Sequence, residues 1–433
     1  MKIVKSFAKG VVVIAAFSFV AFSVLHVVTH GRMFGRSSGF ILDFASFPRL
    51  VKDVVSSVTS PVRHYQLQVD PDFEAVNNLQ QDVFTLESYY AADASHLELK
   101  LVNLRTNEVV HQWQHKREKS VIDGVVSNHP VLLDDYSVIF NLERTLYKID
   151  ANSNLVWKNS TLNFHHTLEF DHEGFLWCPA TVPNGSRDIN SELTVFGNKL
   201  EYRDNLIVKL NPETGEVLYS KPVSDMLLEN NYTGLVYGFW QYDLIHLNDI
   251  QPVYEDTQYW KRGDVFLSCR NIHTVFLYRP STGKILWLRT GLWASQHDVD
   301  VADSTSITIF DNNVNTNFYD QLRWINKGGD QKVMRNVHDP ISLSAIAKYD
   351  FAADSLYYIA SGMISREKIG TQSQGIFTSL SNGLYFIEET DQGKIFIGND
   401  HETVFKKQFV SADSSFVYYP GWTRIYESIP LKK

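Results

Sequence analysis

The sequence repeats one pattern six times, and this repetition limits the fold more than any other feature. Each copy has an apolar stretch with alternating side chains, a polar turn, and a second apolar stretch that ends in an aromatic residue. The six copies span residues 101–113, 146–157, 207–219, 275–287, 346–358 and 384–396. Turns such as Asn-Pro-Glu-Thr-Gly favour tight reversals, because proline fixes one backbone angle and glycine adopts the left-handed conformation. Each copy therefore predicts an antiparallel hairpin.

The spacing of the hairpins predicts an all-β fold, a six-bladed β-propeller. The terminal aromatic residues of successive copies are 38 to 71 residues apart. These intervals suit four-stranded sheets with inserted loops better than the short turns of a solenoid. A hydrophobic content of 44%, with 13% aromatic residues, suits sheets that pack in layers. We expect the propeller to occupy residues 63–433 as one domain.

The N-terminus predicts a membrane anchor. Lysines at positions 2, 5 and 9 precede the apolar run 11–28, an 18-residue stretch whose polar members are two serines and one histidine. A helix needs about this length to cross a bilayer. We therefore expect a cytoplasmic stub and a transmembrane helix over residues 1–31 and a juxtamembrane stalk over residues 32–62. The alternative is a cleaved secretory signal.

This orientation places the propeller outside the cytosol, in a periplasmic or luminal compartment, because lysine-rich flanks stay on the cytoplasmic side of a membrane. The net charge of −9 is spread along the chain, which argues against a nucleic-acid partner. Two cysteines, Cys178 and Cys269, are too few for a disulfide framework or a four-thiolate metal site. Whether they pair stays open, as does the oligomeric state.

Histidines recur at the points where the chain should reach a new blade. In a propeller the innermost strand of each blade comes first, so its first residues face the central channel. His166, His246 and His297 stand at such points, and His129 stands at a fourth. A lone histidine at a strand start is usually structural, and we expect that of His129. Because equivalent blade positions converge in space, His166, His246 and His297 are predicted to share one site.

Arg270 is the cation expected beside these histidines. It follows the apolar stretch 265–269, where a guanidinium is costly to bury unless it meets an anion or a carboxylate. Its planar fork matches the oxygens of sulfate or phosphate. The combination predicts a site for an oxyanion ester. The structural alternative is a salt bridge from Arg270 to Asp249 or Asp298.

At these residues the chain resembles the arylsulfotransferase family. The matching segments are His165-His166, His246-Leu247-Asn248, Ser268-Cys269-Arg270 and Gln296-His297, in the family's order and within residues 95–425. The resemblance implies transfer of a sulfuryl group from a phenolic sulfate ester to another phenol, without PAPS and without any other cofactor or metal. The implied partners are a small-molecule aryl sulfate donor and a phenolic acceptor, besides the membrane that holds the N-terminal helix.

The resemblance also implies a role for each catalytic residue. His297 is the expected nucleophile, which forms a sulfohistidine intermediate. His246 and Arg270 are expected to bind the sulfuryl oxygens. His166 is expected to assist proton transfer or to bind the oxyanion. One departure is that the exported bacterial enzymes carry a disulfide near the nucleophile, whereas no cysteine lies near His297 here.

Further residues are expected to bind the substrate or to orient the nucleophile. His165, Asn248 and Trp240 are the expected substrate-binding residues, with Trp240 in an aromatic lip just before His246. Asp298 or Asp300 is expected to orient the His297 ring through its other nitrogen.

Three other interpretations stay open. The first is a catalytically silent, exported propeller that acts as a binding module, because this fold serves many roles. The second is a quinoprotein-like dehydrogenase, suggested by Gly-Lys-Ile-Leu-Trp and Gly-Glu-Val-Leu-Tyr; six repeats are fewer than that class uses, and no vicinal cysteine pair is present. The third is a zinc or iron site formed by the histidines and Asp298.

Overall fold

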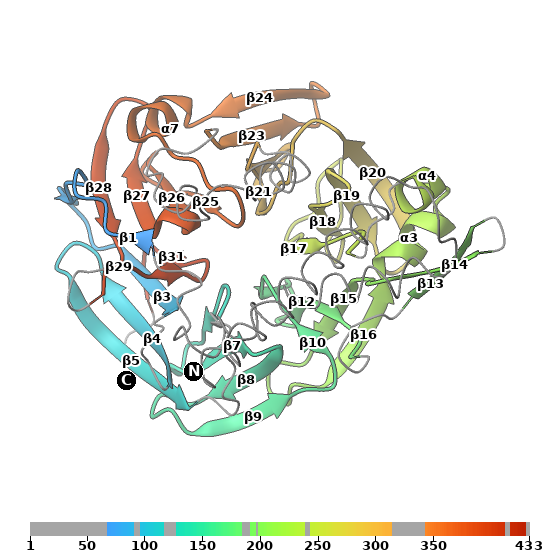
Figure 1. The fold of residues 1–433 in the computed structure, drawn as a ribbon, viewed down its shortest axis with the longest axis horizontal. Helices are drawn as coiled ribbons and strands as arrows, with labels where there is room; N and C mark the ends of the chain where they lie inside the picture. Colours follow the sequence, from blue (N-terminus) through green and yellow to red (C-terminus); the bar gives the residue numbers. More distant parts are fainter. Residues whose placement is uncertain are drawn as a thin grey trace, which may run out of the picture. The chain divides into compact units, whose positions relative to one another are not determined.

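The protein is described by a computed structural model that covers residues 67–90, 96–116, 127–183, 191–195, 198–238, 243–313, 343–411 and 416–429. These residues belong to one compact unit, residues 66–433. Within the described residues, six antiparallel sheets of four or five strands follow one another around a ring (Figure 1). The predicted all-β fold, a six-bladed β-propeller, is confirmed.

The first three blades are built from strands as follows, each from the axis outward. The first has β30 (Tyr419–Pro420) and β31 (Arg424–Tyr426), then β3 (Phe84–Tyr90), β4 (His96–Asn103) and β5 (Glu108–Lys116). The second has β6 (Val131–Leu132), β7 (Val138–Leu142), β8 (Thr145–Ile149) and β9 (Leu155–Asn159). The third has β10 (Asn163–Phe164) and β11 (Glu169–Phe170), then β12 (Leu176–Thr181), β15 (Leu206–Leu210) and β16 (Val217–Pro222).

The other three blades follow the same plan. The fourth has β17 (Leu247–Pro252), β18 (Val265–Cys269), β19 (Thr274–Arg279) and β20 (Lys284–Thr290). The fifth has β21 (Val299–Asp303), β22 (Ser306–Asp311), β23 (Ala345–Asp350) and β24 (Ser355–Ile359). The sixth has β25 (Ile376–Ser379), β26 (Tyr385–Glu389), β27 (Lys394–Gly398), β28 (Thr403–Gln408) and β2 (Val76–Asn77).

Short elements decorate the blades. Two small sheets pair β1 (Leu67–Gln68) with β29 (Phe416–Val417) and β13 (Ser191–Val195) with β14 (Asn198–Tyr202). The helices are α3 (Val223–Glu229), α4 (Thr233–Tyr237), α7 (Ser361–Glu367) and the 3-10 turn η3 (Thr390–Gln392). Among the residues that the structure describes, no helix is long and apolar enough to span a membrane. The predicted anchor over residues 1–31 and stalk over residues 32–62 lie outside the described residues.

All six predicted hairpins are present. Five of them, β4–β5, β8–β9, β15–β16, β19–β20 and β23–β24, form the two outer strands of a four-stranded path, as expected. The sixth, β26–β27, lies one strand nearer the axis, because β28 follows it and pairs outside β27. Side chains alternate between the two faces of the sheet in every strand pair of a blade. The repeat pattern therefore does not distinguish an outer hairpin from one nearer the axis.

The terminal aromatic residues of the repeats join neighbouring blades. The Trp113 indole N–H donates to the Tyr136 carbonyl at 2.9 Å, and the Trp157 indole N–H donates to the Pro212 carbonyl at 3.0 Å. Trp157 also packs on the turn at Gly215, where φ is +72° and a Cβ would lie 2.6 Å from the indole ring. The glycine of the turn is therefore needed both for its backbone angle and for contact between blades.

The hydrophobic core is divided among the blade interfaces. Six clusters of buried residues each lie between two successive blades. At the interface between the third and fourth blades, for example, Trp177 and Ile207 pack with Ile250 and Phe276. Each blade therefore buries both faces of its sheet, as layered packing requires.

Strands from both ends of the described sequence close the ring. The C-terminal strands β30 and β31 pair with β3 and so complete the first blade, while β2 adds to the outer edge of the sixth blade. Closure removes exposed inner edges. Cys178 and Cys269 are both buried and free. The disulfide that the sequence left open is therefore not formed.

Candidate active site

The structure brings the three predicted histidines together on the axial side of the propeller. His166 precedes β11, His246 precedes β17 and His297 precedes β21, each the innermost strand of its blade. The ring centroids of His166 and His246 are 5.4 Å apart. Trp422, from the turn before β31, contacts both His166 and His297. Its ring centroid is 5.6 Å from that of His166 and 5.9 Å from that of His297. Residues from four blades therefore meet at one place.

His246 does not occupy the same blade position as the other two histidines, contrary to the sequence alignment. Hydrogen bonds between blades define the equivalent positions. Thr167, Asp249 and Asp298 accept a hydrogen bond from the backbone N–H of Ile250, Val299 and Phe377, respectively, each in the following blade. By this criterion Asn248 matches His166 and His297, while His246 matches Ser295. β17 also has a register shift between Leu247 and Asp249.

Left-handed backbone conformations mark the site. The φ angles are 58° at His166, 52° at His246, 58° at Ser295, 61° at Gln374 and 54° at Trp422. Such angles are uncommon for residues other than glycine and require support from the surrounding structure. They occur where the chain turns toward an innermost strand, so the turns that place these side chains are themselves strained.

His297 is buried and both of its ring nitrogens are engaged. Its exposed fraction is 1%. Nδ1 lies 2.6 Å from Oδ1 of Asn312 and 3.1 Å from the Ser295 carbonyl, and Nε2 accepts a hydrogen bond of 3.0 Å from the Gln374 N–H. Burial, together with the charge of Arg270, holds the pKa of His297 well below its usual range. The imidazole is therefore neutral at physiological pH, as a nitrogen nucleophile must be.

The expectation that Asp298 or Asp300 orients His297 is wrong. The Asp298 carboxylate accepts the Phe377 N–H at 2.8 Å and so links the fifth and sixth blades. Burial keeps the pKa values of Asp298 and Asp300 well above their usual range, and the charges of neighbouring carboxylates raise both values further. Asn312 holds the ring instead. Sequence reasoning missed it because Asn312 follows β22, the second strand of the fifth blade, where no repeat or motif marks it.

His246 has a carboxylate partner that sequence reasoning also missed. Its Nδ1 lies 2.5 Å from Oδ2 of Asp243. Burial alone would raise the pKa of Asp243, but the hydrogen bond from His246, the charge of His246 and the charge of Arg203 bring it down to about 2. Asp243 is therefore ionised at any working pH and accepts the Nδ1–H of His246.

Arg270 follows β18 and lies near the imidazoles. Its charge lowers the pKa values of His166, His297 and His273, in each case after the larger effect of burial. Its Nη1 donates to Oδ1 of Asn271 at 3.3 Å. A half-buried cation of fixed charge therefore stands beside the imidazoles of His166 and His297, an arrangement that attracts an anion.

The predicted substrate-binding residues have different environments. His165 lies edge-on to His166, with ring centroids 4.9 Å apart. Burial and the charge of Arg203 lower the pKa of His165 to about 3, and its ring nitrogens have no hydrogen-bond partner among the described residues. Asn248 is fully buried and donates to the Gln296 carbonyl at 3.1 Å. Trp240 lies outside the described residues.

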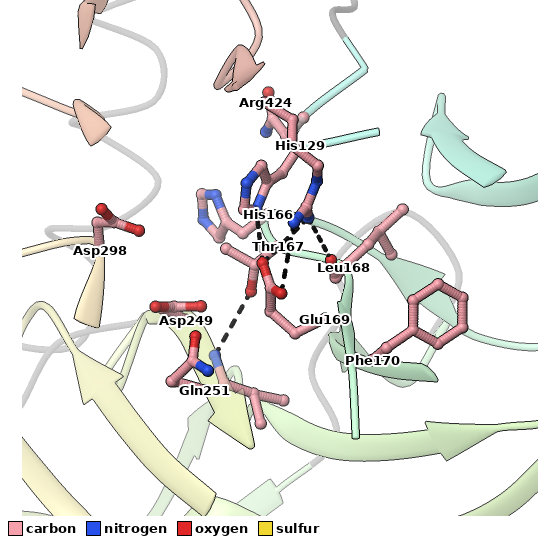
Figure 2. Close-up of polar contacts among 12 residues, drawn as sticks. His129, His166, Thr167, Leu168, Glu169, Phe170, Asp249, Gln251, Asp298 and Arg424 are labelled. Atoms are coloured by element: carbon pink, nitrogen blue, oxygen red, sulfur yellow. Dashed lines mark hydrogen bonds and ion pairs between the residues drawn. The ribbon is translucent and has the colours of Figure 1, made fainter. Parts of the chain in front are cut away.

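His129 belongs to a separate ion cluster, as its structural interpretation anticipated. Nδ1 of His129 lies 3.1 Å from Oε1 of Glu169, and Nη2 of Arg424 lies 3.0 Å from the same oxygen (Figure 2). Burial alone would raise the pKa of Glu169, but Arg424 and His129 hold it at about 2. Burial and the charge of Arg424 lower the pKa of His129 to about 4. The cluster thus consists of a carboxylate, a guanidinium and a neutral imidazole.

The carboxylates of the channel do not converge as metal ligands. Among the described residues, no group of three or more histidine, cysteine, aspartate or glutamate side chains is placed to hold a metal ion. A cavity of about 450 Å³ is lined by Glu169, Tyr254, Trp260 and Asp300, among others, but by none of the three imidazoles.

Comparison with known proteins decides the family. Residues 129–410 match the family model described as arylsulfotransferase (ASST). The chain belongs to the arylsulfotransferase family. The matched region of this arylsulfotransferase-family chain contains His166, His246, Arg270 and His297, so the resemblance is confirmed. Family membership supports aryl sulfotransferase activity in general. No curated protein matches the sequence.

Two solved structures are similar to this chain at low identity. A protein of unknown function from Bacteroides caccae is 11% identical, with 76% of this chain and 93% of that chain covered and a TM-score of 0.45. The Pan2 WD40 domain of Neurospora crassa is 10% identical, with 79% and 80% covered and a TM-score of 0.39. Similarity at this level carries no information about function.

Proposed function

We propose that the protein transfers a sulfuryl group from a phenolic sulfate ester to another phenol, with a covalent intermediate on His297. The main support is that three imidazoles and one guanidinium from three successive blades lie close together inside the region that matches the family. Arg270 lies beside imidazoles whose pKa values are lowered, so the site holds positive charge where an oxyanion ester would bind.

The first step forms a bond between Nε2 of His297 and sulfur as the bond from sulfur to the phenolic oxygen breaks. The donor leaves as a phenolate, and the proton on Nδ1 of His297 stays in place. Arg270 and His246 stabilise the negative charge on the sulfuryl and leaving oxygens. In the second step the acceptor oxygen attacks sulfur, His166 takes the phenolic proton, and the lone pair returns to Nε2.

The hydrogen bond between the Gln374 N–H and Nε2 of His297 must be given up during attack. The lone pair that accepts this N–H at 3.0 Å is the one that bonds to sulfur. Once it is used, the N–H can donate to a sulfuryl oxygen at the same place. The same backbone group would therefore hold the free histidine in position and stabilise the intermediate. His165 and Asn248 lie next to the reacting groups and are proposed to contact the substrate.

The site of action is proposed from the N-terminal sequence. Lysines followed by 18 mostly apolar residues suit a single membrane-spanning anchor, with the propeller in a periplasmic or luminal compartment. Protease digestion of sealed membrane vesicles, with antibodies to each end of the chain, tests this topology. Cleavage of the propeller from the cytoplasmic face would contradict it.

The decisive experiment is mass spectrometry of protein mixed briefly with 4-nitrophenyl sulfate. We expect the mass of one sulfuryl group on the peptide that contains His297, and its loss after phenol is added. His297→Ala should remove both the adduct and the turnover. His401→Ala, which changes an exposed histidine in the turn between β27 and β28, is the matched control and should retain both. Undiminished turnover in His297→Ala would reject the role of His297.

A further inference from the structure

We propose that Asn312 is the positioning residue that decides which nitrogen of His297 attacks sulfur. The inference rests on the proposed function, because it concerns the nucleophile of that reaction. Asn312 is fully buried and follows β22. It lies between the His297 ring and the segment 371–375, and it contacts both.

The contacts of Asn312 settle how its amide is oriented. Its nitrogen donates to the Thr371 carbonyl at 3.0 Å and to the Gln374 carbonyl at 2.7 Å. Carbonyl oxygens only accept hydrogen bonds, so the opposite orientation of the amide would set its oxygen against two acceptors. The amide oxygen must therefore face His297, whose Nδ1 lies 2.6 Å away.

The orientation of the amide fixes the tautomer of His297. An amide oxygen cannot donate, so Nδ1 must carry the hydrogen of the neutral ring. The Ser295 carbonyl, 3.1 Å from Nδ1, is a second group that only accepts. Nε2 is left with the lone pair, and the Gln374 N–H, which only donates, lies 3.0 Å from it. Three independent partners thus agree on one tautomer.

The same contacts help the reaction itself. As the bond between Nε2 and sulfur forms and the bond between sulfur and the phenolic oxygen breaks, the ring gains positive charge. Two acceptors at Nδ1, the Asn312 and Ser295 oxygens, stabilise that charge without removing the proton. Asn312 also joins the ring to the Gln374 carbonyl, so His297, Asn312 and Gln374 form a closed circuit of hydrogen bonds.

The first test compares Asn312→Ala with wild type in sulfuryl transfer from 4-nitrophenyl sulfate to phenol. We expect kcat to fall about 100-fold, in line with the loss of groups that orient a reactive histidine, while KM changes by less than about threefold. The matched control is Asn103→Ala, which removes a buried amide that contacts Asp82 and Arg105 in the first blade. It should retain the wild-type kcat. A wild-type kcat in correctly folded Asn312→Ala would overturn the proposal.

Asn312→Asp tests the pH dependence of kcat/KM, which would not change if Asn312 had only a structural role. The carboxylate still accepts from Nδ1, but its negative charge favours the protonated ring of His297. The ring must be neutral to attack, so the acid limb of the kcat/KM profile should move to higher pH. This variant is nearly the same size as the native side chain but sets an oxygen against the Thr371 and Gln374 carbonyls, so circular dichroism first checks that it is folded. A folded Asn312→Asp protein decides the question if Asn312→Ala fails to fold. An unmoved acid limb contradicts the proposal.

A measurement without substrate separates this inference from the proposed function. In full-length protein labelled with ¹⁵N-histidine, NMR spectra should show the hydrogen of His297 on Nδ1, with His297→Ala used to assign the signals. Asn312→Ala loses one acceptor at Nδ1 and the bond that holds the Gln374 carbonyl, so part of the ring population should show the Nε2–H form. Hydrogen on Nε2 in wild type would overturn the inference. If the tautomer is as expected but the protein transfers no sulfuryl group, the proposed function is rejected. The role of Asn312 in holding the ring would still stand.

Discussion

The Asp243 carboxylate and the His246 imidazole are joined by a hydrogen bond of 2.5 Å between Oδ2 and Nδ1. Asp243 also lies near Arg203, with 3.6 Å between its Oδ2 and the Arg203 Nη1. Because the pKa of Asp243 is about 2, its carboxylate always accepts the Nδ1–H of His246. Nε2 is the nitrogen left for the substrate, and it must carry a hydrogen to donate to a sulfuryl oxygen. The pair therefore orients one ring that the proposed mechanism places on the sulfuryl oxygens.

Asp243→Asn should lower kcat/KM for aryl sulfate by about tenfold to 100-fold, as the loss of a carboxylate that orients a functional histidine generally does. An amide carries no negative charge, so it stabilises less well a His246 ring with hydrogen on both nitrogens, the form that donates to Asp243 and to a sulfuryl oxygen together. Steady-state kinetics with 4-nitrophenyl sulfate measure the effect. Asp225→Asn, on the exposed side of α3, is the control. Equal kcat/KM values for Asp243→Asn and Asp225→Asn would count against the pair.

Glu169→Gln should destabilise the propeller by about 3 kcal/mol, because it leaves the buried Arg424 guanidinium without its carboxylate. Glu169 also pairs with His129, so the loss affects residues from three blades. The matched variant is Glu173→Gln, which breaks an exposed pair with Lys209 and should cost less than about 1 kcal/mol. Urea midpoints of both variants test the difference. Similar midpoints would show that the cluster contributes little.

The effect of Glu169 should depend on pH. Its folded pKa of about 2 lies below the ordinary glutamate value of 4.5, so the folded state binds fewer protons than the unfolded state between these two pH values. The stabilisation is therefore complete above about pH 5 and is lost as pH falls toward 2. The difference in urea midpoint between wild type and Glu169→Gln should shrink over that window. A constant difference from pH 6 to pH 3 would contradict the assignment.

Gly375→Ala should both destabilise the protein and slow catalysis. Gly375 has φ of +100°, and a Cβ there would lie 2.5 Å from the buried Phe310 ring. We expect a cost of about 3 kcal/mol from strain and overpacking, and a lower kcat because Gln374 would shift away from His297. Gly291→Ala is the matched control: φ is +74° but no atom lies within 4 Å of the added carbon.

Gly291→Ala should therefore cost about 1 kcal/mol from backbone conformation alone and leave kcat unchanged. Thermal unfolding and steady-state kinetics measure both effects. A Gly375→Ala protein with the stability and kcat of Gly291→Ala would show that the segment 371–375 can shift without affecting His297.

The blades could be predicted from the sequence because their signals are local. Alternation and the turn glycines, such as Gly215, act within about ten residues, and six copies reinforce one another. The pattern could not place the hairpin 384–396 within its blade, because apolar and polar side chains alternate in the same way in inner and outer strand pairs. Nor could it reveal that His246 lies two residues out of step with His297, which the hydrogen bonds between blades show.

The histidines of the site could be predicted because the topology repeats them, but their partners could not. Asn312 is 15 residues from His297, and Asp243 lies in the turn that precedes His246 by three residues. Neither position repeats in other blades. Such contacts depend on how loops pack after the ring has closed, so only the three-dimensional arrangement identifies them.

Trp422 should support catalysis by serving as a common wall for the imidazoles. Its indole is fully buried and stacks on His166 at an interplanar angle of 21°, while His297 and His129 approach it edge-on. Trp422→Leu removes that wall, so we expect a loss of about 3 kcal/mol in stability and a fall of at least tenfold in kcat, because misplaced reacting groups are costly. Trp422→Phe keeps an aromatic face and should retain most of the activity.

The control for Trp422→Leu is Trp260→Leu, which empties a similar volume in the apolar cluster between the fourth and fifth blades. It should lose a similar amount of stability without lowering the kcat of the folded protein. Measuring kcat well below the thermal midpoint of each variant separates packing from catalysis. Both variants remove a buried indole, but only the Trp422 indole touches His166 and His297. Equal kcat values in the two variants would therefore mean that Trp422 contributes only to the hydrophobic core.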